Sequence, residues 1–355
     1  MRDKFSNLFI DRTRDGTKIS TDKYLESGKF KIIDQGQSYI AGYTNTEEGI
    51  FSDVPAIVFG DHTRCIKYVD FPFFLGADGV KVLKSTKNNA NYKYWYYALK
   101  NVNIPNTGYN RHFKWLKEAT FTIHAEDEQK HIVEVLDKLT SLIQHKQKQI
   151  SKLDELVKSR FIELFGLPVS NTKHWNTEKM KNIAPAVNYT GDFEETVWLL
   201  NLDMVEAQTG RIIDYLYVAG NEVGNSTCTF DTSNVLYSKL RPYLNKVVIP
   251  DRCGYATSEM VPLKPNPSKI ERTYLAFMLR SDEFVKMISE KVAGAKMPRV
   301  SMNDFREFNV PVPPMTLQSQ FATFVEQTDK SKFEIQKSLE ETQKLFDSLM
   351  QEYFG

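Results

Sequence analysis

Cysteine is scarce in this chain of 355 residues, where it occurs only as Cys65, Cys228 and Cys253. An odd number of cysteines without a C-x-x-C pair argues against a disulfide framework and against a four-thiolate zinc site. We therefore expect a reducing, cytoplasmic setting.

Long apolar runs and an excess of charge of one sign are also missing. No segment reaches the ~18 apolar residues that a membrane-spanning helix needs, and the N-terminus, MRDKFSNLFIDRTRDG, lacks the apolar stretch of a secretory signal. The chain has 46 basic and 45 acidic side chains, a net charge of +1. We expect a soluble protein with no membrane partner, on which any basic patch is local.

Common catalytic signatures are absent. The chain has no G-x-x-x-x-G-K-[ST], G-x-G-x-x-G, H-E-x-x-H or G-x-S-x-G motif. Asp127–Lys130 resembles the carboxylate and lysine of metal-dependent nucleases, but acidic residues are ordinary at a helix start because they favour the helix dipole. His124 and His131 are seven residues apart without a third ligand. We expect no catalysis, no metal and no cofactor on this chain.

The chain does contain an internal repeat. Two long helical patterns, at 125–166 and 316–355, both end in Phe-Gly and correspond at a single offset of 189 residues. Composition predicts roughly two chance identities over this length. The ungapped comparison has eight, which pair Gln129, Gln147, Lys148, Leu156, Ser159, Glu163, Phe165 and Gly166 with Gln318, Gln336, Lys337, Leu345, Ser348, Glu352, Phe354 and Gly355.

Each of these two patterns carries a narrow apolar seam. Its spacing alternates between three and four residues, which is typical of coiled coils, and each helix would be roughly 50 Å long. We expect the two helices to pair, although each seam could instead cover its own globular half. The residues expected to pair the helices are Ile132, Leu136, Leu139, Ile143, Ile150, Leu153, Val157, Phe321, Val325, Leu339, Phe346 and Leu349.

The remaining segments, 1–124 and 167–315, predict two globular halves of α+β class. They mix short β runs with short helices and turn residues, whereas a doubly wound parallel sheet needs regular strand–helix alternation. The halves correspond loosely: Ala56–Phe59 with Asn234–Tyr237, Val80–Lys84 with Met260–Lys264, helix Tyr92–Lys100 with helix Arg272–Arg280, and Phe121–Ile123 with Val310–Val312.

Two loops in matching places suggest a binding surface. Residues 108–114 and 294–301 each combine a glycine with Arg, Lys and hydrogen-bonding side chains just before the last strand of a half, and loops 34–38 and 238–241 are similar. Arg and Lys contact guanine edges or phosphates, and Asn or Gln contacts adenine. Each loop alone could simply be exposed and polar. The candidate DNA-binding residues are Gln35, Gln37, Arg64, Asn110, Arg111, His112, Lys114, Lys239, Arg241, Lys296, Arg299 and Ser301.

These features together resemble the specificity subunit of type I restriction-modification enzymes. The resemblance extends over the whole chain, and the closing stretch is its most specific part. It rests on Tyr24–Gly36, Lys158–Gly166, Trp175, Lys179–Ile183, Pro311–Pro314, Gln318, Asp329–Leu339 and Ser348–Gly355.

The resemblance implies two target recognition domains, 1–124 and 167–315, each reading one half of a split site in double-stranded DNA. Helices 125–166 and 316–355 would pair antiparallel as a spacer and dock two methyltransferase subunits, which recruit the restriction subunits. S-adenosylmethionine, ATP and Mg²⁺ would bind those partners, not this non-catalytic chain. The first half departs from the pattern, with Lys4–Leu8 in place of a counterpart to Trp175 and Lys179–Met180, and with His124-Ala125 in place of Pro313-Pro314.

Two other functions remain open. The chain could be a coiled-coil scaffold whose halves bind proteins instead of DNA, or a self-contained nuclease or methyltransferase, which the missing motifs disfavour.

Overall fold

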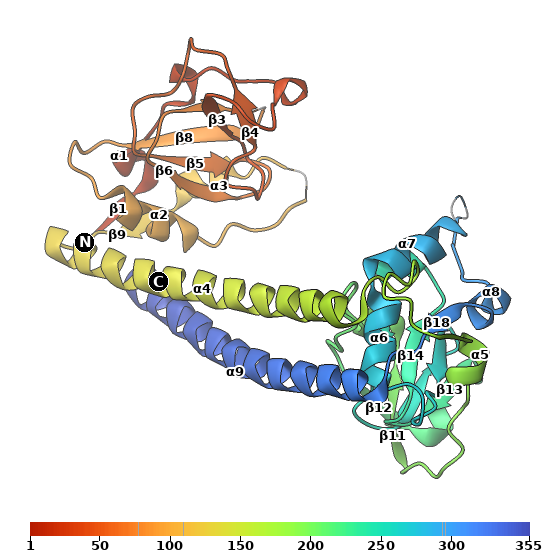
Figure 1. Ribbon diagram of the computed structural model, residues 1–355. Coiled ribbons are helices and arrows are strands. Elements are labelled where there is room, and N and C mark those ends of the chain that lie inside the picture. The colour runs from red at the N-terminus through yellow and green to blue at the C-terminus, as the bar shows by residue number, and fades with distance from the viewer. Residues whose placement is uncertain (77, 109, 293, 295) are drawn as a thin grey trace. The chain divides into compact units, whose positions relative to one another are not determined.

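The computed structural model describes residues 1–355 except 77, 109, 293 and 295. It divides into two compact units (Figure 1). Unit 1 comprises Met1–Gln147 and Gln336–Gly355, and unit 2 comprises Lys148–Ile335. Both units mix α-helices with short β-strands, and no helix among the described residues is long and apolar enough to cross a membrane.

Unit 1 is built on three small sheets. Their strand orders are β1-β9, β2-β8-β5-β6 and β4-β3-β7. Strand β5 is buried along its whole length, as expected for an apolar inner strand. The elements are β1 (Arg2–Lys4), α1 (Phe5–Leu8), β2 (Phe9–Asp11), β3 (Phe30–Ile33), β4 (Gly42–Thr44), β5 (Ala56–Gly60), β6 (Ile66–Val69), β7 (Phe73–Leu75), β8 (Val80–Ser85), α2 (Tyr92–Lys100), α3 (Phe113–Glu118), β9 (Thr120–Thr122) and the first part of α4 (Glu126–Phe165).

Unit 2 repeats this plan. Its sheets have the orders β10-β18, β12-β11-β16-β13 and β15-β14-β17. Helices α6 to α8 accompany them. Besides the last part of α4, the elements are β10 (Thr177–Lys179), α5 (Met180–Ile183), β11 (Thr196–Leu200), β12 (Leu216–Ala219), β13 (Thr227–Phe230), β14 (Val235–Ser238), the 3-10 turn η5 (Pro242–Leu244), β15 (Val247–Val248), β16 (Gly254–Thr257), β17 (Met260–Leu263), α6 (Arg272–Arg280), α7 (Asp282–Glu290), α8 (Met302–Arg306), β18 (Asn309–Pro311) and α9 (Met315–Phe354), whose last part belongs to unit 1.

The loose sequence correspondence between the halves extends to backbone pairing. Strand β1 pairs antiparallel with β9 as β10 does with β18, and β5 pairs with β8 as β14 does with β17. The helices predicted at Tyr92–Lys100 and Arg272–Arg280 are confirmed at these bounds. Each begins at a side-chain cap, Asn91 or Glu271, which accepts a hydrogen bond from a first-turn N–H.

A tyrosine of α2 or α6 holds the centre of each core. Tyr94 donates to the Thr122 carbonyl at 2.7 Å, and its ring lies 5.3 Å from that of Phe354. Tyr274 donates to the Pro311 carbonyl at 3.0 Å, and its ring lies 4.7 Å from that of Phe165. Each core is therefore completed by the last turn of a long helix.

Helices α4 and α9 each run for 40 residues. In unit 1, Lys146 Nζ donates to the Ser338 carbonyl at 2.9 Å and to Thr342 Oγ1 at 2.6 Å. In unit 2, the Phe161 and Phe321 ring centroids are 5.5 Å apart, and Lys332 forms an ion pair with Asp154. The two helices are thus in contact within each unit.

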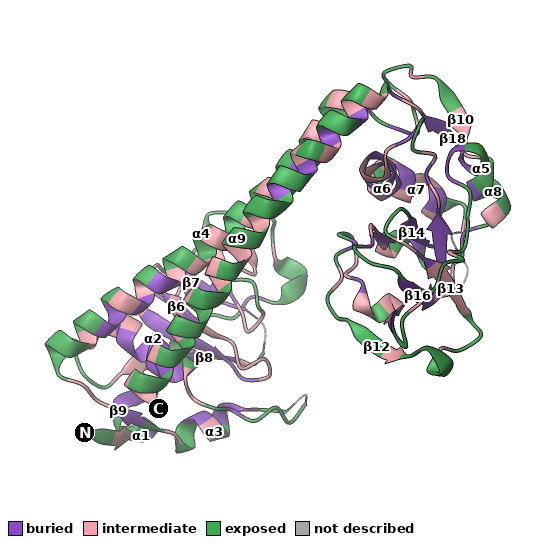
Figure 2. Cartoon of the chain, turned by 90° about the horizontal axis from the view of Figure 1, so that it is seen from below, coloured by how far each residue is buried: buried purple, intermediate pink, exposed green. Residues whose placement is uncertain are grey.

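Burial along the predicted seam is uneven (Figure 2). The ends of both helices contribute to the globular cores. At these ends the second prediction applies, in which each seam covers its own globular half. The middle positions are only partly buried. The buried seam residues are Ile132, Leu136, Leu139, Val157, Phe321 and Val325, and the partly buried ones are Ile143, Ile150, Leu153, Leu339, Phe346 and Leu349.

Candidate nucleic-acid interface

Four loops of unit 1 are joined by hydrogen bonds into one surface, which we call loop cluster 1: residues 34–38, 60–65, 78–79 and 106–114. Gln35 links three of them, because its Nε2 donates to the Asp78 carbonyl at 2.9 Å and its Oε1 accepts from the His62 N–H at 3.1 Å. Gly79 has a φ of +93°, and a Cβ there would lie 2.5 Å from Gln35 Oε1. Only glycine fits that position.

The fourth loop is fixed by Asp61, which is 3% exposed. Its carboxylate accepts from the Phe113 N–H at 2.7 Å, and its carbonyl accepts from the His112 N–H at 2.8 Å. The His112 ring is fully buried, with Nδ1 3.0 Å from the same carbonyl. The side chain predicted to contact DNA therefore supports the loop from inside and offers no surface to a ligand.

The other predicted residues of loop cluster 1 are at its surface. Gln37, Asn110, Arg111 and Lys114 are exposed, whereas Arg64 is half-buried and its guanidinium donates to the Ile104 carbonyl at 3.2 Å. Tyr109, which precedes Asn110, lies outside the described residues. Within loop cluster 1 the three cations Arg64, Arg111 and Lys114 are matched in number by three carboxylates, Asp34, Asp61 and Asp78.

Asp78 is an exposed carboxylate of loop cluster 1. Its pKa lies below the ordinary value because Lys18 donates a hydrogen bond to it, at 2.9 Å, and Arg111 adds positive charge. Asp34 contacts the buried Lys67, whose Nζ also donates to the Asp34 and Ser38 carbonyls at 2.8 and 2.7 Å. Lys18 thus neutralises the Asp78 carboxylate, and Lys67 neutralises the Asp34 carboxylate and holds loop 34–38 in place.

Unit 2 has a matching surface, loop cluster 2, formed by residues 238–243 and 296–301. The Arg241 N–H donates to the Pro298 carbonyl and the Val300 N–H to the Lys239 carbonyl, both at 2.8 Å. These bonds join the two loops that the sequence singled out in this half. Ala295, at the start of the second loop, lies outside the described residues.

The predicted residues of loop cluster 2 differ in exposure and in whether another side chain or backbone group already binds them. Arg241 and Lys296 are exposed, and Lys239 is half-buried. Arg299 is engaged by Glu259, with N–O distances of 3.1 and 2.6 Å. Ser301 caps α8, since its hydroxyl accepts from the Asp304 N–H. Any contact with Arg299 would therefore compete with an ion pair.

The clusters share one strained feature. Arg64 has a φ of +62° and Arg241 a φ of +49°, a region that residues with a side chain rarely adopt. Both follow a corresponding strand, β5 or β14, and both stand in a loop bonded to the loop before α3 or α8. Such strain often marks functional positions.

Tertiary structure adds two residues that the sequence analysis did not select. His62 joins loop cluster 1, where its Nδ1 lies 3.2 Å from the Asn110 carbonyl. Tyr243 follows Arg241 and is 49% exposed. Each lies two residues from a predicted arginine, Arg64 or Arg241, and this proximity in sequence could have indicated them.

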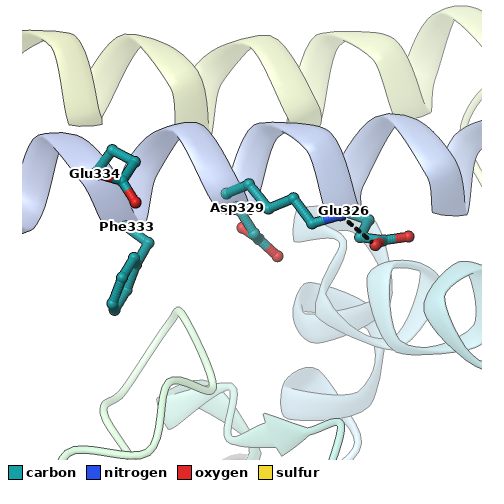
Figure 3. Close-up of a pocket in the computed structure, with 5 residues that line it drawn as sticks. Glu326, Asp329, Phe333 and Glu334 are labelled. Carbon is teal, nitrogen blue, oxygen red and sulfur yellow. Dashed lines mark hydrogen bonds and ion pairs between the residues drawn. The ribbon is translucent and has the colours of Figure 1, made fainter.

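Elsewhere, a hollow of about 530 Å³ lies along α9 in unit 2 (Figure 3). It is lined by Glu326, Asp329, Lys330, Phe333 and Glu334. The Lys330 ammonium is 2.7 Å from the Glu326 carboxylate. Three carboxylates make this hollow a poor site for phosphates. Among the described residues, no group of three His, Cys, Asp or Glu side chains could hold a metal ion.

Two structurally matched α+β units, each with a hydrogen-bonded loop cluster that exposes Arg and Lys side chains and each packed against both long helices, make this chain a tandem-repeat protein. The family model described as type I restriction modification DNA specificity domain matches residues 9–155 and 169–344. Since these segments make up most of the chain, the chain belongs to that family.

Curated relatives carry corresponding names. The type I restriction enzyme EcoDI specificity subunit of Escherichia coli is 28% identical over 165 residues, which are 46% of this chain and 36% of that protein. The EcoR124I/EcoR124II specificity subunit of Escherichia coli is 28% identical over 137 residues, 35% of this chain and 34% of that protein. The matches thus span about a third of the length of these relatives.

Solved structures share the fold. A type I restriction-modification system S subunit from M. genitalium aligns over 100% of this chain and 96% of its own, with a TM-score of 0.63 and 18% identity. A chain from a structure of type I R-M complex assembly and conformational transition aligns over 99% and 97%, with a TM-score of 0.56 and 11% identity.

Proposed function

We propose that this chain is the DNA specificity subunit of a type I restriction-modification complex. The observation that carries the proposal is the duplicated loop cluster in a chain whose two halves match the DNA specificity domain model. Loop clusters 1 and 2 would each contact one half of a bipartite target in double-stranded DNA. Catalysis would belong to methyltransferase and restriction subunits, which would bind S-adenosylmethionine, ATP and Mg²⁺.

The recognition residues of the proposal are the exposed or half-buried cations and amides of the clusters, together with the hydroxyl of Ser301. Arg and Lys would contact guanine edges or phosphates, and Gln or Asn would contact adenine. His112 is left out because its ring is buried. The set is Gln35, Gln37, Arg64, Asn110, Arg111 and Lys114 in unit 1, and Lys239, Arg241, Lys296, Arg299 and Ser301 in unit 2.

The spacer of the proposal is an antiparallel coiled coil of α4 and α9. Contacts in both units support it, because Lys146 meets Ser338 whereas Phe161, further along α4, meets Phe321, which is earlier in α9. The domains would then be 1–124 and 167–315, with helices 125–166 and 316–355 between them. The helix surface would dock two methyltransferase subunits, and restriction subunits would join through these.

The test is to produce the chain with the methyltransferase subunit of its own system and to map methylated bases by single-molecule sequencing. We expect methylation at a split sequence with two short specific parts and a fixed gap. A contiguous motif, or methylation that does not depend on this chain, would overturn the proposal. Association without any DNA affinity would favour the scaffold alternative.

A further inference from the structure

Strand β12 forms an open edge of a sheet in unit 2. Among the described strands it pairs only with β11, in a sheet of order β12-β11-β16-β13. It is exposed along most of its length (Figure 2). An unpaired edge presents backbone groups that can bind another strand, so proteins usually protect it with lysine, proline or a bulge. The segment 213–219 contains neither lysine nor proline.

The register of β12 on β11 determines which backbone groups this edge presents. The Gly220 N–H donates to the Glu195 carbonyl at 2.9 Å, so these two opposite residues form a hydrogen-bonded pair. Opposite residues alternate between hydrogen-bonded and non-hydrogen-bonded pairs. Tyr217 and Ala219 are therefore in non-hydrogen-bonded pairs, and their N–H groups point away from β11. In the described part of the chain, these two N–H groups have no acceptor.

The matching edge in unit 1 is occupied. Strands β3, β4 and β7 pair as β11, β12 and β16 do, with one antiparallel and one parallel neighbour of the central strand. On the outer side of β4, the Leu25 N–H donates to the Tyr43 carbonyl and the Tyr43 N–H donates to the Leu25 carbonyl, both at 2.9 Å. The fold thus accepts an extended, antiparallel segment on the edge that unit 2 leaves open.

The side chains along this edge are largely apolar. Four of them are between 37% and 55% exposed: Ile213, Tyr215, Leu216 and Tyr217. The Arg252 guanidinium donates to the Tyr217 hydroxyl and lies 4.9 Å from the Tyr215 ring centroid, so it holds both aromatic side chains in place. Aromatic side chains stabilise a sheet by packing across neighbouring strands. An added strand would therefore find packing partners that are already ordered.

The exposed charges at the two ends of the edge are negative. Asp214 precedes β12, and Glu195 and Glu222 lie at the other end. Two nearby cations are each bound by a carboxylate, in the pairs Arg211–Glu206 and Arg252–Asp251. A second copy of β12, paired antiparallel, would place carboxylates opposite carboxylates, which is destabilising. Charge complementarity therefore favours a cationic occupant.

We infer that the outer edge of β12 is a docking site for an extended, cationic segment of a partner protein, which adds to the sheet as an antiparallel strand. The N–H groups of Tyr217 and Ala219 would donate to its backbone. Lysine or arginine side chains near its two ends would meet Asp214 and Glu222. Unit 1 does not offer this site, because Leu25 pairs there, so one segment binds per chain. The inference does not depend on the proposed function.

Ala219→Pro tests the backbone contact. Ala219 has a φ of −64° and a ψ of 139°, which proline adopts without strain, and the substitution removes only an outward N–H. Ala219→Val is the matched control, because it also enlarges the side chain but keeps the N–H. Both variants should keep the melting temperature of the unaltered chain.

The probe is a synthetic peptide, Lys-Thr-Val-Thr-Val-Thr-Val-Thr-Lys, which is as long as segment 214–222. The control peptide has glutamate in place of both lysines. Fluorescence anisotropy measures binding to the full chain, and hydrogen exchange of the Tyr217 and Ala219 amides locates it. We expect the lysine peptide to bind more tightly than the glutamate peptide and to slow exchange at both amides. Ala219→Pro should weaken its binding about tenfold, the order expected for one lost hydrogen bond, whereas Ala219→Val should not.

Four results would overturn the inference. They are absence of binding of the lysine peptide, equal binding of the two peptides, equal binding to Ala219→Pro, and unchanged exchange at Tyr217 and Ala219. Should Ala219→Pro lower the melting temperature, the exchange measurement on the unaltered chain decides. Sedimentation of the chain alone tests self-pairing, and we expect a monomer. A dimer that Ala219→Pro dissociates would assign the edge to a second copy and overturn the cationic partner.

Discussion

Arg64 and Arg241 hold left-handed backbones, which cost about 1–2 kcal/mol for a residue with a side chain. A strained position that served only packing would be improved by glycine. We expect Arg241→Gly to keep or raise the melting temperature of the chain and to weaken binding of the assembled complex to its target about tenfold or more, as loss of a base contact does.

Arg241→Lys separates charge from geometry in this prediction. It keeps the positive charge but lacks the planar fork that bonds a guanine edge at two points. Fluorescence titration with duplexes mutated in one half-site at a time should show that the loss is confined to the half contacted by unit 2. Equal affinity of Arg241→Gly and the unaltered chain would contradict the role of this arginine.

Tyr94 makes the free energy of unfolding of the chain depend on pH in the alkaline range. Burial raises the pKa of its phenol to about 12, whereas an unfolded tyrosine titrates near 10. Between these values the unfolded chain releases a proton that the folded chain keeps, so stability is full below pH 10 and falls as pH rises above it. Denaturant unfolding at pH 8 to 11 measures this fall.

Tyr94→Phe is the companion variant. It should lose about 1 kcal/mol at neutral pH through the missing hydrogen bond to Thr122. Above pH 10 it should lose less stability than the unaltered chain. A parallel fall in both proteins would show that Tyr94 is not a source of the pH dependence.

Among the secondary-structure elements, the long helices α4 and α9 lead to a prediction about the gap between the two half-sites. Polar contacts from Lys146 to Ser338 and Thr342 mark the middle of the pair in unit 1. Inserting seven residues after Gln147 and seven before Gln336 would preserve the seam, because a heptad restores its phase. The insertion adds about 10 Å of helix, roughly three base pairs of duplex.

We therefore expect methylation mapping of the lengthened chain to show a gap longer by roughly three base pairs, with both half-sites unchanged. Inserting three residues in place of seven shifts the seam to another face and serves as the control, which should lose stability. Changed half-site bases with an unchanged gap would contradict the role of the helices as a spacer.

At the scale of the whole molecule, the tandem repeat predicts that the two halves act separately. Replacing residues 1–124 with the corresponding segment of another family member should change one half-site and leave the other intact. The new segment must keep β1 and β9, which pair from Arg2 to Thr122, and the core tyrosine that meets Phe354. Methylation mapping of the hybrid complex is the measurement. A change in both half-sites would show that the halves are not independent.

Much of the architecture was predictable because it is encoded locally. The 3.6-residue periodicity of Tyr92–Lys100 and Arg272–Arg280 predicts both helices at their observed bounds. The sequence also paired Gly108 with Gly294 as turn positions, and both have a positive φ in the structure. His112 was mispredicted as a surface residue, because a histidine among Asn, Arg and Lys gives no local sign that Asp61, 51 residues earlier, encloses it.

The repeat, the two long helices and the α+β class are encoded in the order of residues, because periodicity and self-similarity can be read from that order directly. The folded chain was needed to show which loops meet, which arginines have a strained backbone and which identical residues of the helices are exposed. These properties depend on contacts between residues far apart in the chain, such as Gln35 with Asp78 or Arg241 with Pro298. No local pattern records such contacts.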